Sequence, residues 1–543
     1  MYNQNSTVSS NYRYTVSPAN LLATRRDFAF SYGISEIVPY TPPLDCGEPG
    51  SWAAVTLNFT VTSNGTQYDR LAIFTFQNVE IWRSSTPEPT RGDGIIWTYI
   101  KDVTRYTPLF AKDGTFILQL DNIIQTGLDG VYSTVLYATF YASSKEIPPA
   151  KTSDLIVPIS TFKNDTGNAA SVPPGFSVNV NLPQDTVQVF AELYASGNAA
   201  EEFWVSNYVL FNIELTIPTE VRLLVDGQLA GVAFPYITIF TGGFVPAVWR
   251  PISSYGALDL PTYFLDLTPF APLLADGKTH QITIDVASSE SDHATLQNWY
   301  VSGVLQVFTD PSKKPTTGKI TRYSVKPFAQ SKTTGTVREN GDVVVTVSAT
   351  RKLSIEADVV SGSGNVNHVV WSQALEFSNT QYYLDNTKRQ NIKQTSTGQF
   401  ISRHNGVPRV IDRFSYPIQV NYTILSDDGN SWKTDFDHSY DRDLLPLPIL
   451  VRSAIEQRQT AVGFYNRAPT GNFGNGTNNN TFRYVDWNGN TYRRRVNAAY
   501  NNVTLDEVSG TLAPASGGQH TSHLGENDNS SVDSKARVPG RSV

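Results

Sequence analysis

The sequence has one cysteine, Cys46, and seven histidines among its 543 residues. A single cysteine excludes an intramolecular disulfide and any metal site that needs a cluster of cysteines. The histidines are scattered, and the closest pair, His520 and His523, lies in a polar C-terminal stretch. We therefore expect neither a protein metal site nor a cofactor.

Charge and long apolar runs are also scarce. Charged residues make up 17% of the chain and the net charge is −7, so no basic excess points to nucleic acid as a partner. We find no apolar run long enough to span a bilayer. The string "DGKT" at 276–279 has Pro272 where a phosphate loop needs its first glycine. No G-x-S-x-G elbow occurs either, which argues against a serine hydrolase of that type.

The N-terminal string "MYNQNSTVSSNYRYTV" has no basic region and no apolar core, so no signal peptide is visible in this chain. Nine sequons nevertheless favour a secreted glycoprotein, in the secretory pathway, outside the cell or in a vacuole. They begin at Asn5, Asn58, Asn64, Asn164, Asn421, Asn475, Asn479, Asn502 and Asn529.

The abundant features are aromatic residues, at 12%, with 37 Gly and 31 Pro. Short segments that alternate apolar and polar residues recur between turn signals, which predicts an all-β protein of two tandem β-sandwiches with a further β-rich C-terminal domain; the family resemblance described below implies that the two sandwiches are jelly-roll-like. The expected units are a flexible segment 1–23, a first sandwich 24–149, a second sandwich 150–312, a C-terminal domain 313–512 and a disordered tail 513–543.

An internal similarity links the two expected sandwiches. Residues 99–121, "YIKDVTRYTPLFAKDGTFILQLD", can be laid beside 263–286, "YFLDLTPFAPLLADGKTHQITIDV". Each has a strand that begins with an aromatic residue, then Asp and Thr, a Pro-containing stretch, "DG" and a return strand. A duplicated sandwich explains this pattern; two unrelated sandwiches with common turn chemistry are the alternative.

Two stretches carry candidate carboxylates. Asp69 and Arg70 in "QYDRLAIF" form either a solvated ion pair or a base whose arginine keeps it ionised. In "AEEFWVSN", Glu202 and Trp204 would share one face of a strand, and Glu201 the other. Solvent-facing acids beside core rings are the simpler interpretation; a sugar site with acids for chemistry and rings for stacking is the other.

Two further stretches combine arginine with tryptophan. "IFTGGFVPAVWRPI" (239–252) places Trp249 beside Arg250 after a glycine pair, as either a packed loop or a binding surface. "FQNVEIWRSSTPEPT" contains Glu80 and Glu88, and we interpret most of its side chains as structural.

These stretches together resemble the peptide:N-glycanase A-type amidases of plants and fungi. The matching strings lie in the family's order over roughly 40–310, and include "VTLNFTVTSNGTQYDRLAIF", "VEIWRSSTPEPT", "AEEFWVSN" and "GVAFPYITIFTGGFVPAVWRPI". Such enzymes hydrolyse the amide between asparagine and the first N-acetylglucosamine of an N-glycan. The resemblance therefore implies an amidase whose partners are N-glycosylated peptides and glycoproteins.

The resemblance extends to the bacterial amidase peptide:N-glycanase F, which has two jelly rolls. Its catalytic Asp lies in a Trp-Asp-Arg string, which is similar to Tyr68-Asp69-Arg70 here. Its second acid lies in a Glu-Trp string, which implies Glu202 rather than Glu201. A third acid follows a strand similar to "TFILQLDN", which implies Asp121. The cysteines that flank the bacterial Glu-Trp string are absent.

Amide hydrolysis needs an activated water, a stabilised oxyanion and a proton for the leaving nitrogen. Our hypothesis is that Asp69 activates water and that Glu202 binds the sugar and assists the leaving nitrogen. Desolvation by nearby rings would raise the pKa of Glu202, which would suit an acidic working pH. Arg70, Arg250, Trp204, Trp249, Glu201 and Asp121 would contribute to substrate binding.

Two other functions fit the same residues. A non-catalytic N-glycan-binding protein would retain the glycopeptide unchanged, and jelly rolls are common among lectins. A glycoside hydrolase could use the carboxylates as an acid–base pair, but it would leave a sugar on the peptide.

Overall fold

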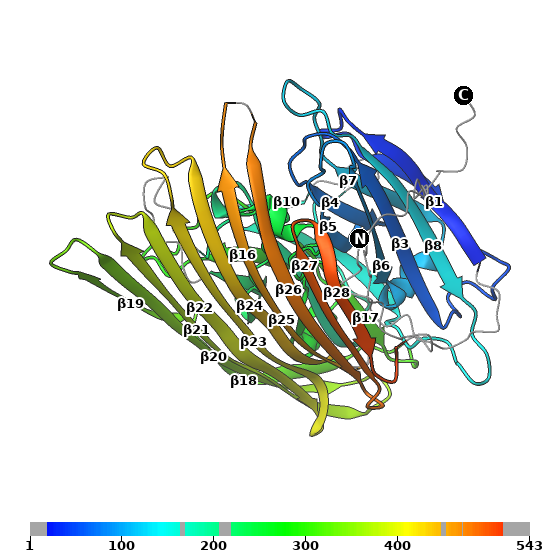
Figure 1. Ribbon diagram of the computed structural model, residues 1–543. Coiled ribbons are helices and arrows are strands. Elements are labelled where there is room, and N and C mark those ends of the chain that lie inside the picture. The colour runs from blue at the N-terminus through cyan, green and yellow to red at the C-terminus, as the bar shows by residue number, and fades with distance from the viewer. Residues whose placement is uncertain (1–18, 163–168, 206–218, 447–451, 470, 514–543) are drawn as a thin grey trace.

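The part of the chain that the structure describes consists of three β-sheet units (Figure 1). The computed structural model describes residues 19–162, 169–205, 219–446, 452–469 and 471–513. The expected all-β fold is confirmed, because the alternating segments form antiparallel strands in which every second side chain is buried. The expected N-terminal segment up to residue 18 and the expected tail from residue 514 lie outside the described residues.

The first unit is a sandwich of two four-stranded antiparallel sheets. Aromatic rings fill the space between the sheets: Phe74 stacks on Trp82 at 4.3 Å, and Phe59 meets Phe74 edge-on. One sheet has the order β1 (Ala19–Phe28), β8 (Tyr132–Tyr141), β3 (Ala54–Ser63) and β6 (Ile95–Asp102). The other has the order β2 (Glu36–Tyr40), β7 (Gly114–Leu120), β4 (Leu71–Phe76) and β5 (Val79–Ser85).

The second unit repeats this order strand for strand, with β9 (Leu155–Ile159) added beside β17. One sheet runs β10 (Ala170–Val172), β17 (Trp299–Thr309), β12 (Thr186–Gly197) and β15 (Tyr263–Asp266). Its partner runs β11 (Phe176–Val180), β16 (His280–Ala287), β13 (Glu220–Val225) and β14 (Gln228–Ala233). The repeated connectivity supports the duplication that the internal similarity predicts.

The duplication extends to single hydrogen bonds at one corner. In the first unit η1 (Thr104–Tyr106) and α1 (Thr107–Phe110) join β6 to β7; in the second, η4 (Thr268–Phe270) and α2 (Ala271–Leu274) join β15 to β16. The Asp102 carboxylate accepts the N–H of Thr104 at 2.8 Å, and Asp266 accepts that of Thr268 at 2.8 Å. This side-chain-to-backbone bond starts the same turn in both units.

The third unit is one curved 11-stranded antiparallel sheet (Figure 1). Ten strands follow each other in the order β18 (Thr317–Val325), β20 (Val343–Val360), β21 (Val366–Leu384), β22 (Arg389–His404), β23 (Val407–Ile424), β24 (Ser431–Pro446), β25 (Ser453–Asn466), β26 (Phe473–Asp486), β27 (Thr491–Ala499) and β28 (Asn502–Ser509), and β19 (Gln330–Val337) also pairs with β20.

The inner face of this large sheet packs on the second sandwich and shares its hydrophobic core. Trp371 is fully buried and donates its indole N–H to the carbonyl of Ala230 at 2.9 Å. The buried guanidinium of Arg351 pairs with Glu220 at 2.6 Å. The large sheet therefore has no separate core and stabilises the sandwich that it covers.

Glu192 joins the two sandwiches from a fully buried position on β12. Its carboxylate accepts two hydrogen bonds from Arg105, at 2.7 and 2.9 Å, and one each from Tyr106 and Thr262. A buried carboxylate with four donors is well compensated, so this cluster fixes the sandwiches relative to each other. In the described ranges no helix has the length and apolar character needed to cross a membrane.

Candidate active site

Asp69 and Glu88 of the first sandwich meet Gly242 of the second. A Cβ on Gly242 would collide with Asp69 Oδ1 and Glu88 Oε1, so both carboxyl oxygens flank the same point. Only glycine allows the backbone to approach so closely. The site is therefore built from both sandwiches.

Short backbone contacts hold these three residues in place. Asp69 lies just before β4, and Glu88 follows β5 between Pro87 and Pro89, which restrict the local backbone. Thr86 links the segments: its hydroxyl accepts the N–H of Arg70 at 2.8 Å, its own N–H donates to the carbonyl of Arg70, and its carbonyl accepts the hydroxyl of Thr241.

Glu202 is the third carboxylate of the site, and burial dominates the acidity of all three. Burial raises the pKa of Asp69 to about 6, although its own N–H, that of Gly242 and the charge of Arg70 oppose the rise. Burial and then the charge of Asp69 raise the pKa of Glu202 to about 7 and that of Glu88 to about 8. All three residues are intermediate in burial, so water can reach them; we call the place where they meet the carboxylate recess.

Two arginines flank the carboxylates. Arg250 donates to the carbonyls of Glu88 and Pro89, and its charge opposes the rise in the pKa of Glu88. Arg70 donates to Asn122, Tyr32 and Gln67. The charge of Arg70 lowers the pKa of Asp69 and so favours its ionised form, which is the direction of our hypothesis, but burial raises that pKa by more than the guanidinium charge lowers it.

The expectation that Glu202 and Trp204 share a strand face is wrong. β12 ends at Gly197, and η2 (Ala199–Glu201) and a turn carry the chain through 202–205. Glu201 is fully buried and accepts the N–H of Leu296 at 2.6 Å, which ties this turn to the loop before β17. Trp204 packs near Trp299 and is only 6% exposed, so its ring is a core residue.

Trp249 and Asp121 both have partners within the protein. Trp249 ends η3 (Pro246–Trp249), is 1% exposed, donates to the Gly243 carbonyl and packs on Phe436. No sugar can reach such a ring. Asp121 accepts the N–H of Gly33 at 3.1 Å and the side-chain amide of Gln119 at 3.0 Å, which gives it a structural role.

Two exposed aromatic rings lie beside Asp69 and Arg70: Tyr68 precedes Asp69 in the chain and is 60% exposed, and Tyr32, which accepts a hydrogen bond from Arg70, is 57% exposed. The Arg70 guanidinium lies 5.9 Å from the Tyr68 ring centre and 5.7 Å from that of Tyr32. Rings of this kind suit the apolar face of a sugar. The sequence analysis gave no site role to Tyr68, Tyr32 or Glu88; for Glu88, its position between two prolines was the available signal.

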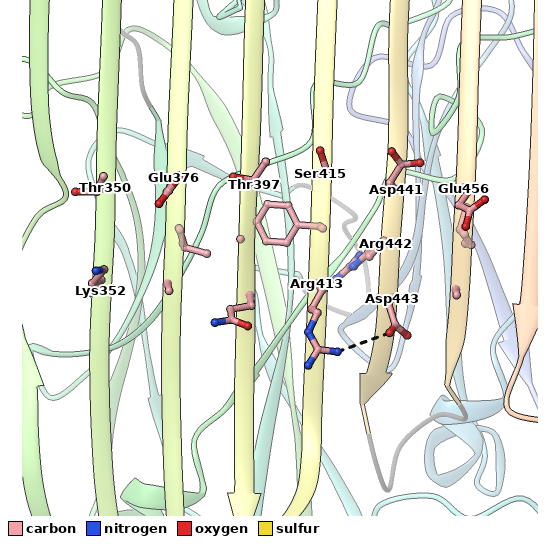
Figure 2. A pocket seen from close by; sticks show the side chains of 17 residues that line it. Thr350, Lys352, Glu376, Thr397, Arg413, Ser415, Asp441, Arg442, Asp443 and Glu456 are labelled. Carbon is pink, nitrogen blue, oxygen red and sulfur yellow. Dashed lines mark ion pairs between the residues drawn. The ribbon is translucent and has the colours of Figure 1, made fainter.

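A separate hollow of about 570 Å³ lies on the outer face of the large sheet (Figure 2). Its walls carry opposed charges, among them Arg413, which faces Asp443 at 3.9 Å, and Glu456, which pairs with Arg483 beyond the hollow. We assign no chemistry to this face. Within the described residues, no group of three or more His, Cys, Asp or Glu side chains is arranged to hold a metal ion.

Known proteins with related sequences share this organisation. Residues 7–326 match the family model of peptide N-acetyl-beta-D-glucosaminyl asparaginase amidase A, and residues 344–418 match that family's C-terminal domain. The peptide-N4-(N-acetyl-beta-glucosaminyl)asparagine amidase A of Prunus dulcis is 31% identical over an alignment of 380 residues, and the match covers 64% of this chain and 64% of that relative. The match thus spans somewhat less than two thirds of that relative.

The similarity of this chain to solved structures is lower. PNGase F, a glycosylasparaginase from Flavobacterium meningosepticum, is 16% identical with a TM-score of 0.36, over 54% of this chain and 96% of its own. PNGF-II is 14% identical with a TM-score of 0.38, over 54% of this chain and 66% of its own. At this level the likenesses carry no argument about the site. Because the family model covers more than half of the sequence, the chain belongs to the peptide N-acetyl-beta-D-glucosaminyl asparaginase amidase A family.

Proposed function

We propose that this protein hydrolyses the amide bond between asparagine and the first N-acetylglucosamine of N-glycans on peptides and glycoproteins. The observation that carries the proposal is the meeting of three desolvated carboxylates with different pKa values, Asp69, Glu88 and Glu202, in one solvent-accessible recess. Titratable groups whose pKa values are separated by their surroundings can act as base and acid in one reaction.

Asp69 has the lowest pKa of the three, so it is the first to ionise and serves as the base. In weakly acidic solution it takes a proton from water while the water oxygen bonds to the amide carbon. Glu202 is still protonated there and gives its proton to the nitrogen as the C–N bond breaks. The products are aspartate and a glycosylamine, and the proton on Asp69 returns to Glu202 through solvent.

Glu88 and Arg250 complete the recess in this scheme. Protonated Glu88 can donate a hydrogen bond to the substrate, and the Arg250 guanidinium beside it supplies positive charge for the developing oxyanion. One such donor is typically worth roughly 3–4 kcal/mol in the transition state. Tyr68 and Tyr32 replace Trp204 and Trp249 in our assignment of the sugar-facing rings.

The setting of the enzyme is also part of the proposal. The strand order of both sandwiches, two sheets of four with the same crossovers, is that of a jelly roll. The sequon residues Asn64, Asn479 and Asn502 are exposed, which supports deglycosylation of substrates within the secretory pathway or beyond it.

Mass spectrometry of a short N-glycopeptide after incubation tests the function. The proposal expects a free peptide in which the glycosylated Asn has become Asp. A peptide that keeps one N-acetylglucosamine would instead identify a glycosidase, and an unchanged peptide would contradict catalysis of either kind.

A further inference from the structure

Side chains on the inner face of β25 contact the loop that carries Arg250. Gln459 exchanges hydrogen bonds with the carbonyl of Ser253 and the N–H of Tyr255, both at 3.0 Å. Gly463 lies against Val245, and a Cβ there would collide with that side chain. Alternation along the strand places the side chain of residue 465 next on this face. Tyr465 is only half-buried, so it lies at the edge of the loop that β25 covers, where solvent reaches the strand.

Neighbouring strands fix the ring of Tyr465. Trp432 on β24 is its direct partner in the sheet, and the two ring centres are 4.8 Å apart at an angle of 36°. On the other side its partner is Gly474 on β26, where a Cβ would come within 2.9 Å of the tyrosine ring. The ring therefore lies over a glycine and against an indole, in a position that the sheet determines.

This aromatic pair is anchored to the carboxylate site. Trp432 donates its indole N–H to the carbonyl of Phe244 at 3.0 Å, and Phe244 packs edge-on against Phe203, next to Glu202. The electrostatic surroundings of Tyr465 also place it near the carboxylates. Burial raises the pKa of Tyr465, and the charge of Glu88 makes the next largest contribution to that shift. Tyr68 is also within electrostatic range of Tyr465.

The solvent side of the pair carries a positive charge. The exposed Arg467 lies over the Trp432 ring, 5.1 Å from its centre. Two rings and a guanidinium at the rim of a carboxylate recess offer flat apolar surface and hydrogen-bond donors together. That combination fits a pyranose with an acetamido group, which presents a flat apolar face for the rings and a carbonyl oxygen for the donors.

We propose that Tyr465, from the C-terminal sheet, is a substrate-positioning residue that holds the N-acetylglucosamine pair next to asparagine, opposite Tyr68 of the first sandwich. The inference rests on the proposed function and deepens it. It gives the large sheet a part in substrate recognition, beyond the support of the second sandwich. The Tyr465 ring supplies the contact, and its hydroxyl adds a hydrogen bond.

Calorimetric binding tests this assignment without turnover. The probes are a short peptide whose Asn carries N,N′-diacetylchitobiose and the same peptide without sugar. Each variant is made in an Asp69→Asn background. We expect Tyr465→Ala to weaken binding of the glycopeptide at least tenfold and Tyr465→Phe to weaken it about threefold or less. Val462→Ala, on the opposite and exposed face of β25, is the matched control and should bind normally.

Gly474→Ala gives a second, independent variant, because its Cβ pushes the Tyr465 ring out of place while the tyrosine is retained. It should also weaken glycopeptide binding. Normal glycopeptide binding by folded Tyr465→Ala, or by Gly474→Ala if the former does not fold, would overturn the inference. So would equal weakening of the sugar-free peptide.

Turnover by the wild-type chain is measured in parallel and decides the proposed function separately. In an active enzyme, Tyr465→Ala should raise KM at least tenfold and change kcat less than threefold. Loss of kcat with unchanged KM would overturn the positioning role.

Discussion

Asp69 Oδ1 and Glu88 Oε1 both lie close enough to Gly242 that a Cβ on residue 242 would collide with each of them. The two acids come from the segments just before β4 and just after β5 of the first sandwich, and the glycine comes from a loop of the second. Neither sandwich alone contains the arrangement. The contact between the units is therefore part of the catalytic geometry, and small changes at this point should affect activity more than folding.

Gly242→Ala should lower kcat/KM at least 100-fold, because the new methyl group displaces both carboxyl groups. Gly335→Ala is the matched control. That glycine is exposed on β19, and the nearest atom to its new Cβ would be the carbonyl oxygen of Val344, 3.9 Å away. Steady-state kinetics with one glycopeptide compare the two. Equal activity of both variants would show that the recess does not require the glycine.

Glu88→Gln should lower kcat by roughly 10²–10⁴-fold if the carboxyl group takes part in proton transfer or orients the substrate. The amide has nearly the same shape, so the fold should be retained. Asp121→Asn should change kcat less than threefold, since Asp121 bonds only to Gly33 and Gln119 in the described structure. A larger effect of Asp121→Asn than of Glu88→Gln would reverse our assignment of the two acids.

The dependence of kcat/KM on pH should be bell-shaped, with a maximum in weakly acidic to neutral solution. Activity should rise through about pH 6 as Asp69 ionises and fall through about pH 7 as Glu202 loses the proton that it donates. The two breaks belong to the coupled carboxylates as a group. Glu202→Gln should remove the break near pH 7 along with most activity; a wild-type profile that is flat from pH 5 to 9 would contradict these roles.

Glu192→Ala should lower the free energy of unfolding by about 3–5 kcal/mol, because it leaves the buried Arg105 guanidinium without its partner. Glu36→Ala removes the partner of Arg26 in a part-exposed pair and should cost about 0–1 kcal/mol. Chemical denaturation measures both. Equal, small losses would mean that the cluster at Glu192 does not hold the sandwiches together.

The sequence predicted the strands and drew attention to Asp69, but it did not predict how the residues around the carboxylates are arranged. Alternation along β3 and the repeated Asp-x-Thr corner are local signals, and they predicted both sandwiches. The string around Asp69 drew attention to the segment on which the proposed site is based. Glu202 was singled out for a strand geometry that does not exist, because the chain turns after Gly197.

The aromatic residues show why the rest of the proposed site could not be predicted from the sequence. Trp249 resembled a sugar-stacking residue in its local string, but Phe436 of the large sheet covers it. Tyr465 is brought to the recess by pairing between β24, β25 and β26, far along the chain from Asp69. Contacts between such distant segments leave no periodic trace in a single sequence.

The most direct test of the account is hydrolysis of an N-glycopeptide in H₂¹⁸O, with wild-type protein and the Asp69→Asn variant side by side. The account predicts that the wild type converts the glycosylated Asn to Asp carrying one ¹⁸O, and that the variant releases product at least 100-fold more slowly. Product at the wild-type rate from Asp69→Asn, or ¹⁸O found in the sugar while N-acetylglucosamine stays on the peptide, would contradict it.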